Sequence, residues 1–233
     1  MGMVWPSLRV FLALCAAVAI TGAPALARSG GAITLPQQAE LDGAVLDYES
    51  GRIDAAQRRL SNLAARGVPA AQFNLAVMHL RGEMPLPDLR AARRLLEQAA
   101  KSGFVTAMFT LGQALEGGQF GKADLPLSHL WYGRAAHAGS VPAQVAVATA
   151  FYLGRGAHRD AESAARWYRE AAKGGDVGAM YLLASMYEQG DGVDKDLRLA
   201  RYWYDIAGRN GDEAAPSKVR ELDARLADPT TPP

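Results

Sequence analysis

Four histidines are the residues of this chain best suited to acid–base or metal chemistry, and their spacing supports neither. They are His79, His129, His137 and His158. His129 and His137 stand eight residues apart, and no cysteine or carboxylate beside them completes a ligand set. His79 is expected to pack in a core, and the sequence contains no nucleophile elbow. The sequence therefore predicts no catalytic site and no metal site.

Two other patterns could in principle bind ions. Gly117-Gly118 and Gly154-Arg155-Gly156 could cradle a phosphate, but both fall where turns between helices are expected. Asp191, Asp194 and Asp196 could suggest a calcium loop, but the required spacing and the terminal glutamate are missing. We interpret these residues as turns and helix caps, and we expect no cofactor.

A regular spacing of glycines sets the organisation of the chain. Five glycines stand 36 residues apart, namely Gly67, Gly103, Gly139, Gly175 and Gly211. A period of this length indicates stacked units, each too small to bury its own apolar face. After each of the first four, small or apolar residues at offsets 4, 8 and 12 follow one face of a helix. A second glycine at offset 15 predicts the end of that helix.

A second helix is predicted in the other half of each unit. An aspartate precedes each of these helices as the expected N-cap, at Asp88, Asp124, Asp160 and Asp196. Alanine pairs and Trp-Tyr pairs follow at packing positions, and no strand-like alternation is present, so we expect an all-α fold. The predicted parts are a flexible segment (28–37), a capping repeat (38–66), four repeats (67–102, 103–138, 139–174, 175–210), a capping helix (211–227, its helix at 215–227) and a disordered tail (228–233).

The later units are similar to a known repeat. The run Tyr187–Asp196, followed by Trp203-Tyr204 and Gly211, resembles the Sel-1-like repeat (SLR) of the tetratricopeptide (TPR) superfamily, and Phe151–Gly156 matches nearly as well. The resemblance covers about residues 38–215. It implies a right-handed α/α solenoid of stacked helix-turn-helix repeats, a scaffold or adaptor role and no catalytic residues.

The first two repeats depart from this pattern. Leu95-Leu96 stands in place of a Trp-Tyr pair, and the turns Gly82-Glu83-Met84-Pro85 and Gly118-Gln119-Phe120-Gly121 are irregular.

The resemblance also implies that the first helix of each repeat lines a concave face that binds a protein or an extended peptide. The candidate positions are offset 5 (Gln72, Met108, Gln144, Met180) and offset 7 (Asn74, Thr110, Ala146, Leu182). Gln72 and Asn74 could bond to a peptide backbone, and Met108 and Met180 offer adaptable apolar contacts. The predicted partner-binding set is Gln72, Asn74, Met108, Gln144 and Met180.

Residues 1–27 have the pattern of a cleaved secretory signal peptide. Arg9 precedes the apolar run 10–20, and an A-x-A site predicts cleavage between Ala27 and Arg28. The run is too short to span a membrane comfortably. Cys15 is the only cysteine, so the exported chain would contain no disulfide. We expect a periplasmic or secreted protein with no membrane span after cleavage.

Charge and composition reduce the number of function classes that the chain could have. Without Arg9 the chain carries 24 basic and 24 acidic side chains, so no global field would attract nucleic acid. We predict an exported, non-catalytic scaffold or adaptor for protein–protein interaction, with a periplasmic regulator of envelope signalling as one concrete form. The alternative is a cell-wall-associated hydrolase or a carbohydrate-binding protein on the same helices. Against a carbohydrate carrier, the three tryptophans outside the signal peptide occupy packing positions.

Overall fold

The computed structural model describes residues 33–227, which form 11 α-helices and no strand. The predicted all-α repeat fold is therefore confirmed for this part of the chain. The expected signal peptide with its cleavage site at Ala27-Arg28, and the expected tail 228–233, lie outside the described residues. Within 33–227, no helix combines the length and the apolar composition that a membrane crossing requires.

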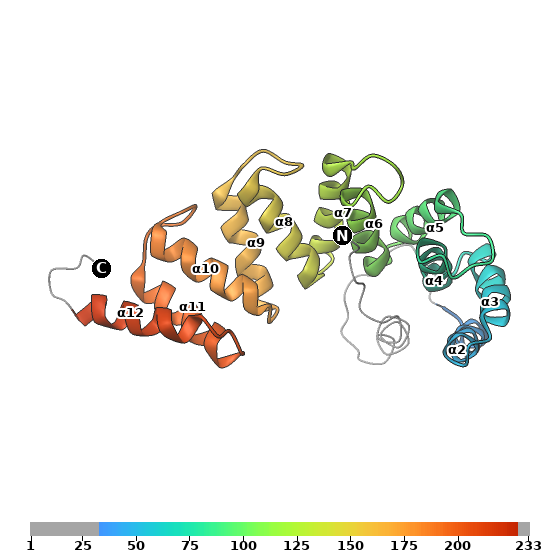
Figure 1. The fold of residues 1–233 in the computed structure, drawn as a ribbon, viewed down its shortest axis with the longest axis horizontal. Helices are drawn as coiled ribbons and strands as arrows, with labels where there is room; N and C mark the ends of the chain where they lie inside the picture. The colour runs from blue at the N-terminus through green and yellow to red at the C-terminus, as the bar shows by residue number, and fades with distance from the viewer. Residues whose placement is uncertain (1–32, 228–233) are drawn as a thin grey trace. The chain divides into compact units, whose positions relative to one another are not determined.

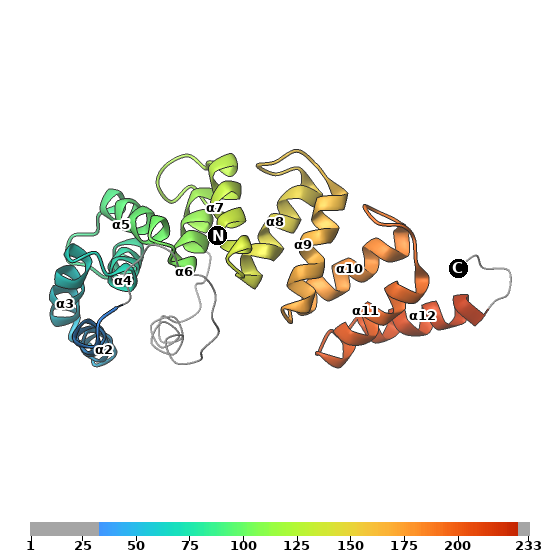
Figure 2. The ribbon, with the colours of Figure 1, turned by 180° about the vertical axis from the view of Figure 1, so that it is seen from behind.

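The helices belong to two compact units, divided between Lys122 and Ala123. Unit 1 holds α2 (Leu35–Glu49), α3 (Ile53–Ala65), α4 (Pro69–Leu80), α5 (Leu89–Lys101) and α6 (Val105–Glu116). Unit 2 holds α7 (Leu125–His137), α8 (Val141–Leu153), α9 (Ala161–Lys173), α10 (Val177–Gln189), α11 (Leu197–Arg209) and α12 (Ala215–Ala227). Within each unit, consecutive helices are joined by short turns and pack side by side (Figures 1 and 2).

The first helix begins earlier than the sequence suggested. Residues 35–37 were expected in a flexible segment, but they form the first turn of α2. Thr34 and Gln37 form a capping box: the Gln37 amide N–H donates to Thr34 Oγ1 at 3.4 Å, and the Thr34 amide donates to Gln37 Oε1 at 2.9 Å. Two orphan amides are satisfied at once, which fixes the helix start at Leu35.

The repeating glycines occupy the conformations that their spacing predicted. All five residues of the 36-residue series have positive φ, between 80° and 101°. Gly154 and Gly190, at offset 15, end α8 and α10 in the left-handed conformation, with φ of 69° and 77°. Glycine adopts this region without the steric cost of a Cβ, so the helices stop at these residues.

The aspartates predicted as caps are confirmed at the start of α5, α7, α9 and α11. Asp88 and Asp196 each accept from two amides of the first turn, and Asp124 and Asp160 accept from one backbone amide each. For Asp160, the hydrogen bonds from the Ser163 hydroxyl and amide lower the pKa of the carboxyl group.

Each unit has its own core of small and aliphatic side chains. In unit 1, Leu60, Leu63 and Leu75 pack with Met84 from the turn after α4. In unit 2, alanines line the helix contacts, and Tyr168 and Tyr204 are buried among them. Small residues let the helices approach closely, and the larger rings fill the remaining space.

A buried carboxylate fastens the first helix pair. Asp47 on α2 accepts from Arg52 at 2.8 Å and from Arg59 at 2.8 Å. The hydrogen bond from Arg52 is the largest cause that lowers the pKa of Asp47. This contact joins the end of α2 to α3.

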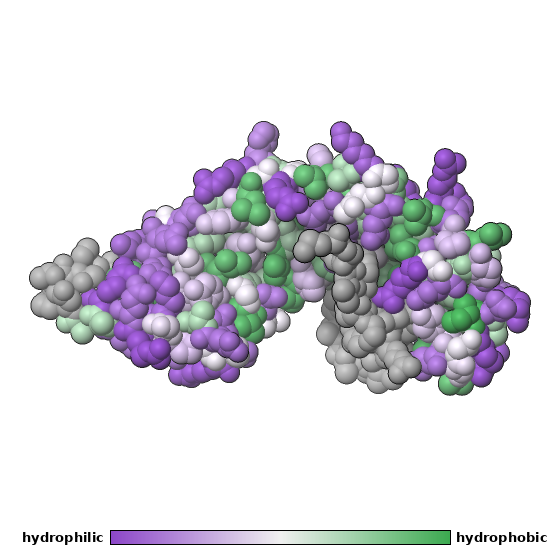
Figure 3. All heavy atoms as spheres, viewed as in Figure 1, coloured by the Kyte–Doolittle hydropathy of each residue, from purple (hydrophilic) through white to green (hydrophobic). Residues whose placement is uncertain are grey.

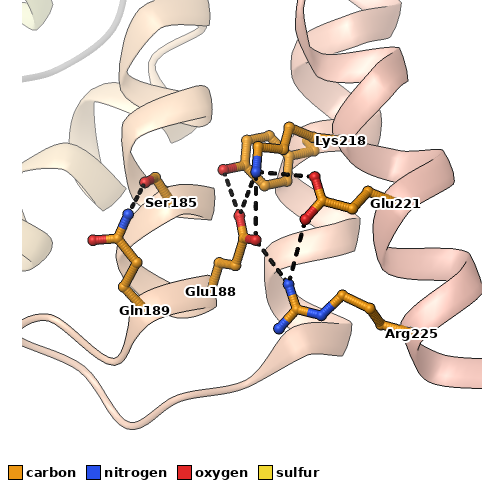
Figure 4. A network of polar contacts seen from close by, with 7 residues as sticks. Ser185, Glu188, Gln189, Lys218, Glu221 and Arg225 are labelled. Atoms are coloured by element: carbon orange, nitrogen blue, oxygen red, sulfur yellow. Dashed lines mark hydrogen bonds and ion pairs between the residues drawn. The ribbon is translucent and has the colours of Figure 1, made fainter. Parts of the chain in front are cut away.

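A second carboxylate fastens the last helix of unit 2 (Figure 4). Glu188 on α10 accepts from the Tyr204 hydroxyl at 3.0 Å and from Arg225 at 2.9 Å, and its Oε1 lies 3.5 Å from Lys218 Nζ. The side chain of Glu188 is only 11% exposed. One acceptor group thus joins α10, α11 and α12, and Leu222 of α12 is fully buried. The face of α11 and α12 seen in Figure 3 is mostly polar.

Candidate binding groove

The histidines lie in separate packing contacts rather than in one site. His79 Nδ1 accepts the amide N–H of Asp88 at 3.1 Å. His129 stands edge-on to Phe151, with ring centroids 4.9 Å apart, and its buried Nδ1 has no hydrogen-bond partner. Burial lowers the pKa of His79 and of His129, so both rings are neutral at pH 7. Among residues 33–227, no cluster of three potential metal ligands exists.

The aspartates near the end of α10 act as caps and ion-pair partners. Asp196 Oδ1 accepts from the amides of Arg198 and Leu199. Asp191 Oδ2 lies 3.6 Å from Arg159. The carboxylates of Asp191 and Asp196 are thus engaged within the fold.

The predicted partner-binding residues all lie on first helices, but at different depths. Gln72, Asn74 and Met180 are buried, with exposed fractions of 6%, 4% and 5%. Met108 and Gln144 are half-buried. The expectation of an open surface is therefore wrong for the first three, and contact of any of the five with a partner stays a prediction.

The burial at offset 5 has a structural cause. The Gln72 side-chain amide donates to the Ala64 carbonyl at 3.3 Å, and Gln144 donates in the same way to Ala136 at 3.4 Å. Both carbonyls lie near the end of the preceding helix, where intrahelical donors run out. The position therefore links one repeat to the next.

These amides are not fully satisfied. Gln72 Oε1, Gln144 Oε1 and Asn74 Nδ2 are buried and make no hydrogen bond. An unpaired buried polar atom costs roughly 1–3 kcal/mol unless another group reaches it. Two of these residues lie on α4, which also forms one wall of the groove described next.

A small groove, partly open to solvent, lies between α4 and α6 in unit 1. Its lining residues are Phe73, Val77, Leu80, Arg81, Thr110, Gln113 and Gln119. The three apolar residues are spaced four and three apart along α4, so they share one helix face. Thr110 and Gln113 share the facing side of α6. One wall is therefore aliphatic and aromatic, and the other carries a hydroxyl and an amide.

The end of the groove is formed by the irregular turn after α6. The turn places Gln119 on the groove, and Gln119 Oε1 is buried without a hydrogen-bond partner. The neighbouring Phe120 ring lies under the guanidinium of Arg93, 5.9 Å away, which holds the turn on α5.

The turn after α4 is held from the other side. Arg81 lies 4.0 Å from Glu83. Burial, followed by the hydrogen bond with Glu83, raises the pKa of Tyr48 to about 12. Tyr48 therefore keeps its proton at neutral pH and connects α2 to the turn beside the groove.

Of the positions considered from the sequence, the groove contains only Thr110, at offset 7. The wall of α4 stands at offsets 6, 10 and 13 from Gly67, and Gln119 lies in an off-pattern turn. The sequence signal that could have pointed to Gln119 was the departure of its turn from the repeat pattern.

Comparison with known proteins identifies the scaffold. The Sel1 repeat matches residues 69–104, 105–140, 141–176 and 177–212. A Sel1 repeat protein from Oxalobacter formigenes has a similar structure, with a TM-score of 0.72 and 27% identity over 77% of this chain and 74% of that chain. The c5321 protein, a protective antigen of uropathogenic Escherichia coli with an SLR fold, has a TM-score of 0.75 and 26% identity over 84% of this chain and 43% of that chain. A search of curated proteins found no match. Four consecutive matching repeats, on helices that stack as in these structures, place the chain in the Sel1 repeat family.

Proposed function

We propose that this chain is an exported, non-catalytic scaffold that binds another protein through the first helices of its repeats. Sel1 repeat proteins generally mediate protein–protein interaction and are typically not enzymes. The observation that carries the proposal is the groove between α4 and α6, which has an apolar wall, a polar wall and solvent access. Such a site suits a polypeptide better than it suits a reaction.

The pattern of residues 1–27 supports export, and export would place the partner in the cell envelope or outside the cell. A regulator of envelope signalling that holds part of a sensor protein is the concrete role that we propose. The half-buried Met108 and Gln144 are the predicted partner-binding residues that a partner can reach first, while Gln72, Asn74 and Met180 would be met only at depth.

The tryptophans give little support to a carbohydrate-binding function. The Trp131 ring is covered by the guanidinium of Arg134, 4.5 Å from its centroid. The rings of Trp167 and His137 are in edge-to-face contact, and so are those of Trp203 and Tyr202. A sugar needs an open, flat ring face, and each of these rings already has a neighbour.

A crosslinking pull-down tests the scaffold role. The chain from Arg28 onward is used as bait in envelope extracts of its own cells, and captured proteins are identified by mass spectrometry. We expect one dominant protein partner, with capture reduced by Met108→Glu or Gln144→Glu tested separately. The control is Arg166→Glu, a change of an exposed residue on the second helix α9. Recovery of cell-wall fragments without a protein partner would contradict the proposal.

A further inference from the structure

We infer that the turn between α4 and α5 in unit 1 contacts the surface of an anionic lipid bilayer. Leu86 and Leu89 enter the outer part of the bilayer, and Arg90 and Arg94 contact lipid phosphates. The groove between α4 and α6 contains none of these four residues. The bilayer contact therefore goes beyond the proposed protein-binding role and adds a location for the chain.

The turn presents two leucines to solvent. Leu86 is 85% exposed and Leu89 is 45% exposed. The turn is nevertheless anchored on both sides of Leu86, because Met84 packs in the core of unit 1 and the Asp88 amide donates to His79 Nδ1 at 3.1 Å. An apolar pair that an anchored turn holds out in water marks a contact with an apolar surface.

Most backbone N–H groups between residues 85 and 91 are either missing or already paired. Leu86 lies between Pro85 and Pro87, which carry no N–H. The Asp88 amide is paired as described above, and the Asp88 carboxylate accepts from two amides in the first turn of α5. An unpaired N–H is costly in lipid, so this composition lowers the cost of placing the turn at a bilayer.

The solvent face of α5 beside the turn is cationic. Arg90, Arg94 and Lys101 are exposed, and their spacing of four and seven residues places them on one side of the helix. Glu97 is the one carboxylate of α5, and it pairs with Arg93 at 2.9 Å. The three remaining cations attract a negatively charged surface.

The two carboxylates of the turn are held within the fold. The Asp88 carboxylate caps α5. The Glu83 carboxylate lies 4.0 Å from Arg81 and is hydrogen-bonded to Tyr48. Both negative charges are thus offset in part by protein groups, which reduces their repulsion from an anionic bilayer.

An anionic bilayer satisfies the leucines and the arginines together. Its apolar interior lies directly beneath a layer of phosphate groups, so apolar and cationic side chains that are neighbours on the protein can each find a partner. A folded protein would need an apolar pocket with acidic residues around it, and nucleic acid would leave Leu86 in water. Because only two leucines insert, the contact is reversible.

The insertion is tested on the chain from Arg28 onward, which contains no cysteine. Leu86→Cys carries an environment-sensitive fluorophore and is mixed with vesicles of phosphatidylglycerol and phosphatidylethanolamine. We expect a blue-shifted emission with these vesicles and a much smaller shift with vesicles of phosphatidylcholine alone. The control is Leu130→Cys on α7 of unit 2, a position that is 49% exposed and should show no shift. An equal response of the two labels, or no response at Leu86, would overturn the inference.

Co-sedimentation with the anionic vesicles separates the apolar contact from the charged one. Leu86→Ser should weaken binding by about tenfold, because the burial of one leucine is lost. Arg90→Ser/Arg94→Ser should weaken binding by roughly thirtyfold at low salt, and added salt should weaken wild-type binding. Arg166→Ser/Lys173→Ser removes the same charge from exposed positions of α9 and should have little effect. Equal losses for the two double variants, with thermal melting unchanged, would overturn the inference.

The bilayer contact and the scaffold function can fail separately. If the chain captures a protein partner but binds no vesicles, the bilayer contact fails and the scaffold function stands. If Leu86→Ser loses the partner and the wild-type chain binds no vesicles, the turn contacts a protein and the inference is overturned. Vesicle binding without a captured protein would support the inference and contradict the scaffold function.

Discussion

The two units carry opposite kinds of residue at one position of the repeat. At offset 17, unit 2 has Gly156 and Gly192, whereas unit 1 has Met84 and Phe120. A Cβ on Gly156 or Gly192 would collide with the backbone at the start of the helix two elements earlier, at Leu125 or Ala161. Met84 instead fills part of the unit 1 core. The turns at offset 17 therefore pack through backbone contact in unit 2 and through side chains in unit 1.

The groove described above lies in unit 1, beside the second of these irregular turns. The backbone of the turns with Gly156 and Gly192 lies directly on a neighbouring helix, so these turns have little freedom to direct a side chain toward another helix. In unit 1 the Phe120 ring packs under the Arg93 guanidinium, and the same turn places Gln119 on the groove between α4 and α6. At the corresponding helix positions of unit 2, side chains bond internally, as Thr149 does with the Tyr168 hydroxyl at 3.0 Å. The groove of unit 1 thus includes a residue from a turn that departs from the repeat.

The largest loss of stability is expected when a Cβ is added to a glycine of unit 2. Gly192→Ala should lower the free energy of unfolding by about 3 kcal/mol, because it adds a backbone collision to the strain of a positive φ. The control is Gly175→Ala, which has φ of 92° and no atom within 4 Å of the new Cβ. It should cost only about 1 kcal/mol. Equal losses of unfolding free energy for the two variants, measured by urea denaturation, would show that the backbone collision adds nothing to the cost.

The next effect comes from removing atoms in unit 1. Met84→Ala should lower the free energy of unfolding by about 2–3 kcal/mol, because Met84 is 7% exposed and the core would retain a cavity. Met84→Leu, which conserves volume, should cost less than about 1.5 kcal/mol. The difference between the two variants in denaturation midpoint is the measurement. If alanine were tolerated as well as leucine, the side-chain closure of unit 1 would be disproved.

The smallest change in stability is expected for one half-buried histidine from each unit. His129→Leu removes an unpaired ring nitrogen and should raise stability by up to about 1 kcal/mol. His79→Leu removes the acceptor of the Asp88 amide and should lower stability by a similar amount. The sign of the change, measured by denaturation at pH 7, distinguishes the two environments, and a shared sign would refute the contrast.

The same residues predict a pH dependence. Burial lowers both pKa values below the ordinary 6.5, so the unfolded chain binds protons that the folded chain does not. Their contribution to stability is fully present above pH 6.5 and is lost as the pH falls through the folded-state pKa values. The wild-type chain should therefore lose stability between pH 7 and pH 5, and the double variant His79→Leu/His129→Leu should lose less.

The sequence predicted those parts of the fold that depend on local chemistry. Glycines such as Gly154 and caps such as Asp160 act within a few residues of themselves, so spacing alone located the helix ends. Gln72 shows where this reasoning stops. Its offset suggested a surface position, but its environment depends on the Ala64 carbonyl of a neighbouring helix, which no local pattern reveals. The groove depends on Gln119 in the same way, since its place follows from an irregular turn.

The Glu188 network determines what happens at the end of the stack. It holds α12 over α10 and α11, with the charged residues Arg220, Glu221 and Asp223 turned to solvent. Loss of α12 would remove Lys218 and Arg225, and of the hydrogen bonds to Glu188 named above only that from the Tyr204 hydroxyl would remain. A nearly buried carboxylate that loses its cationic partners is destabilising, so the α10–α11 pair depends on the last helix as much as the last helix depends on the pair.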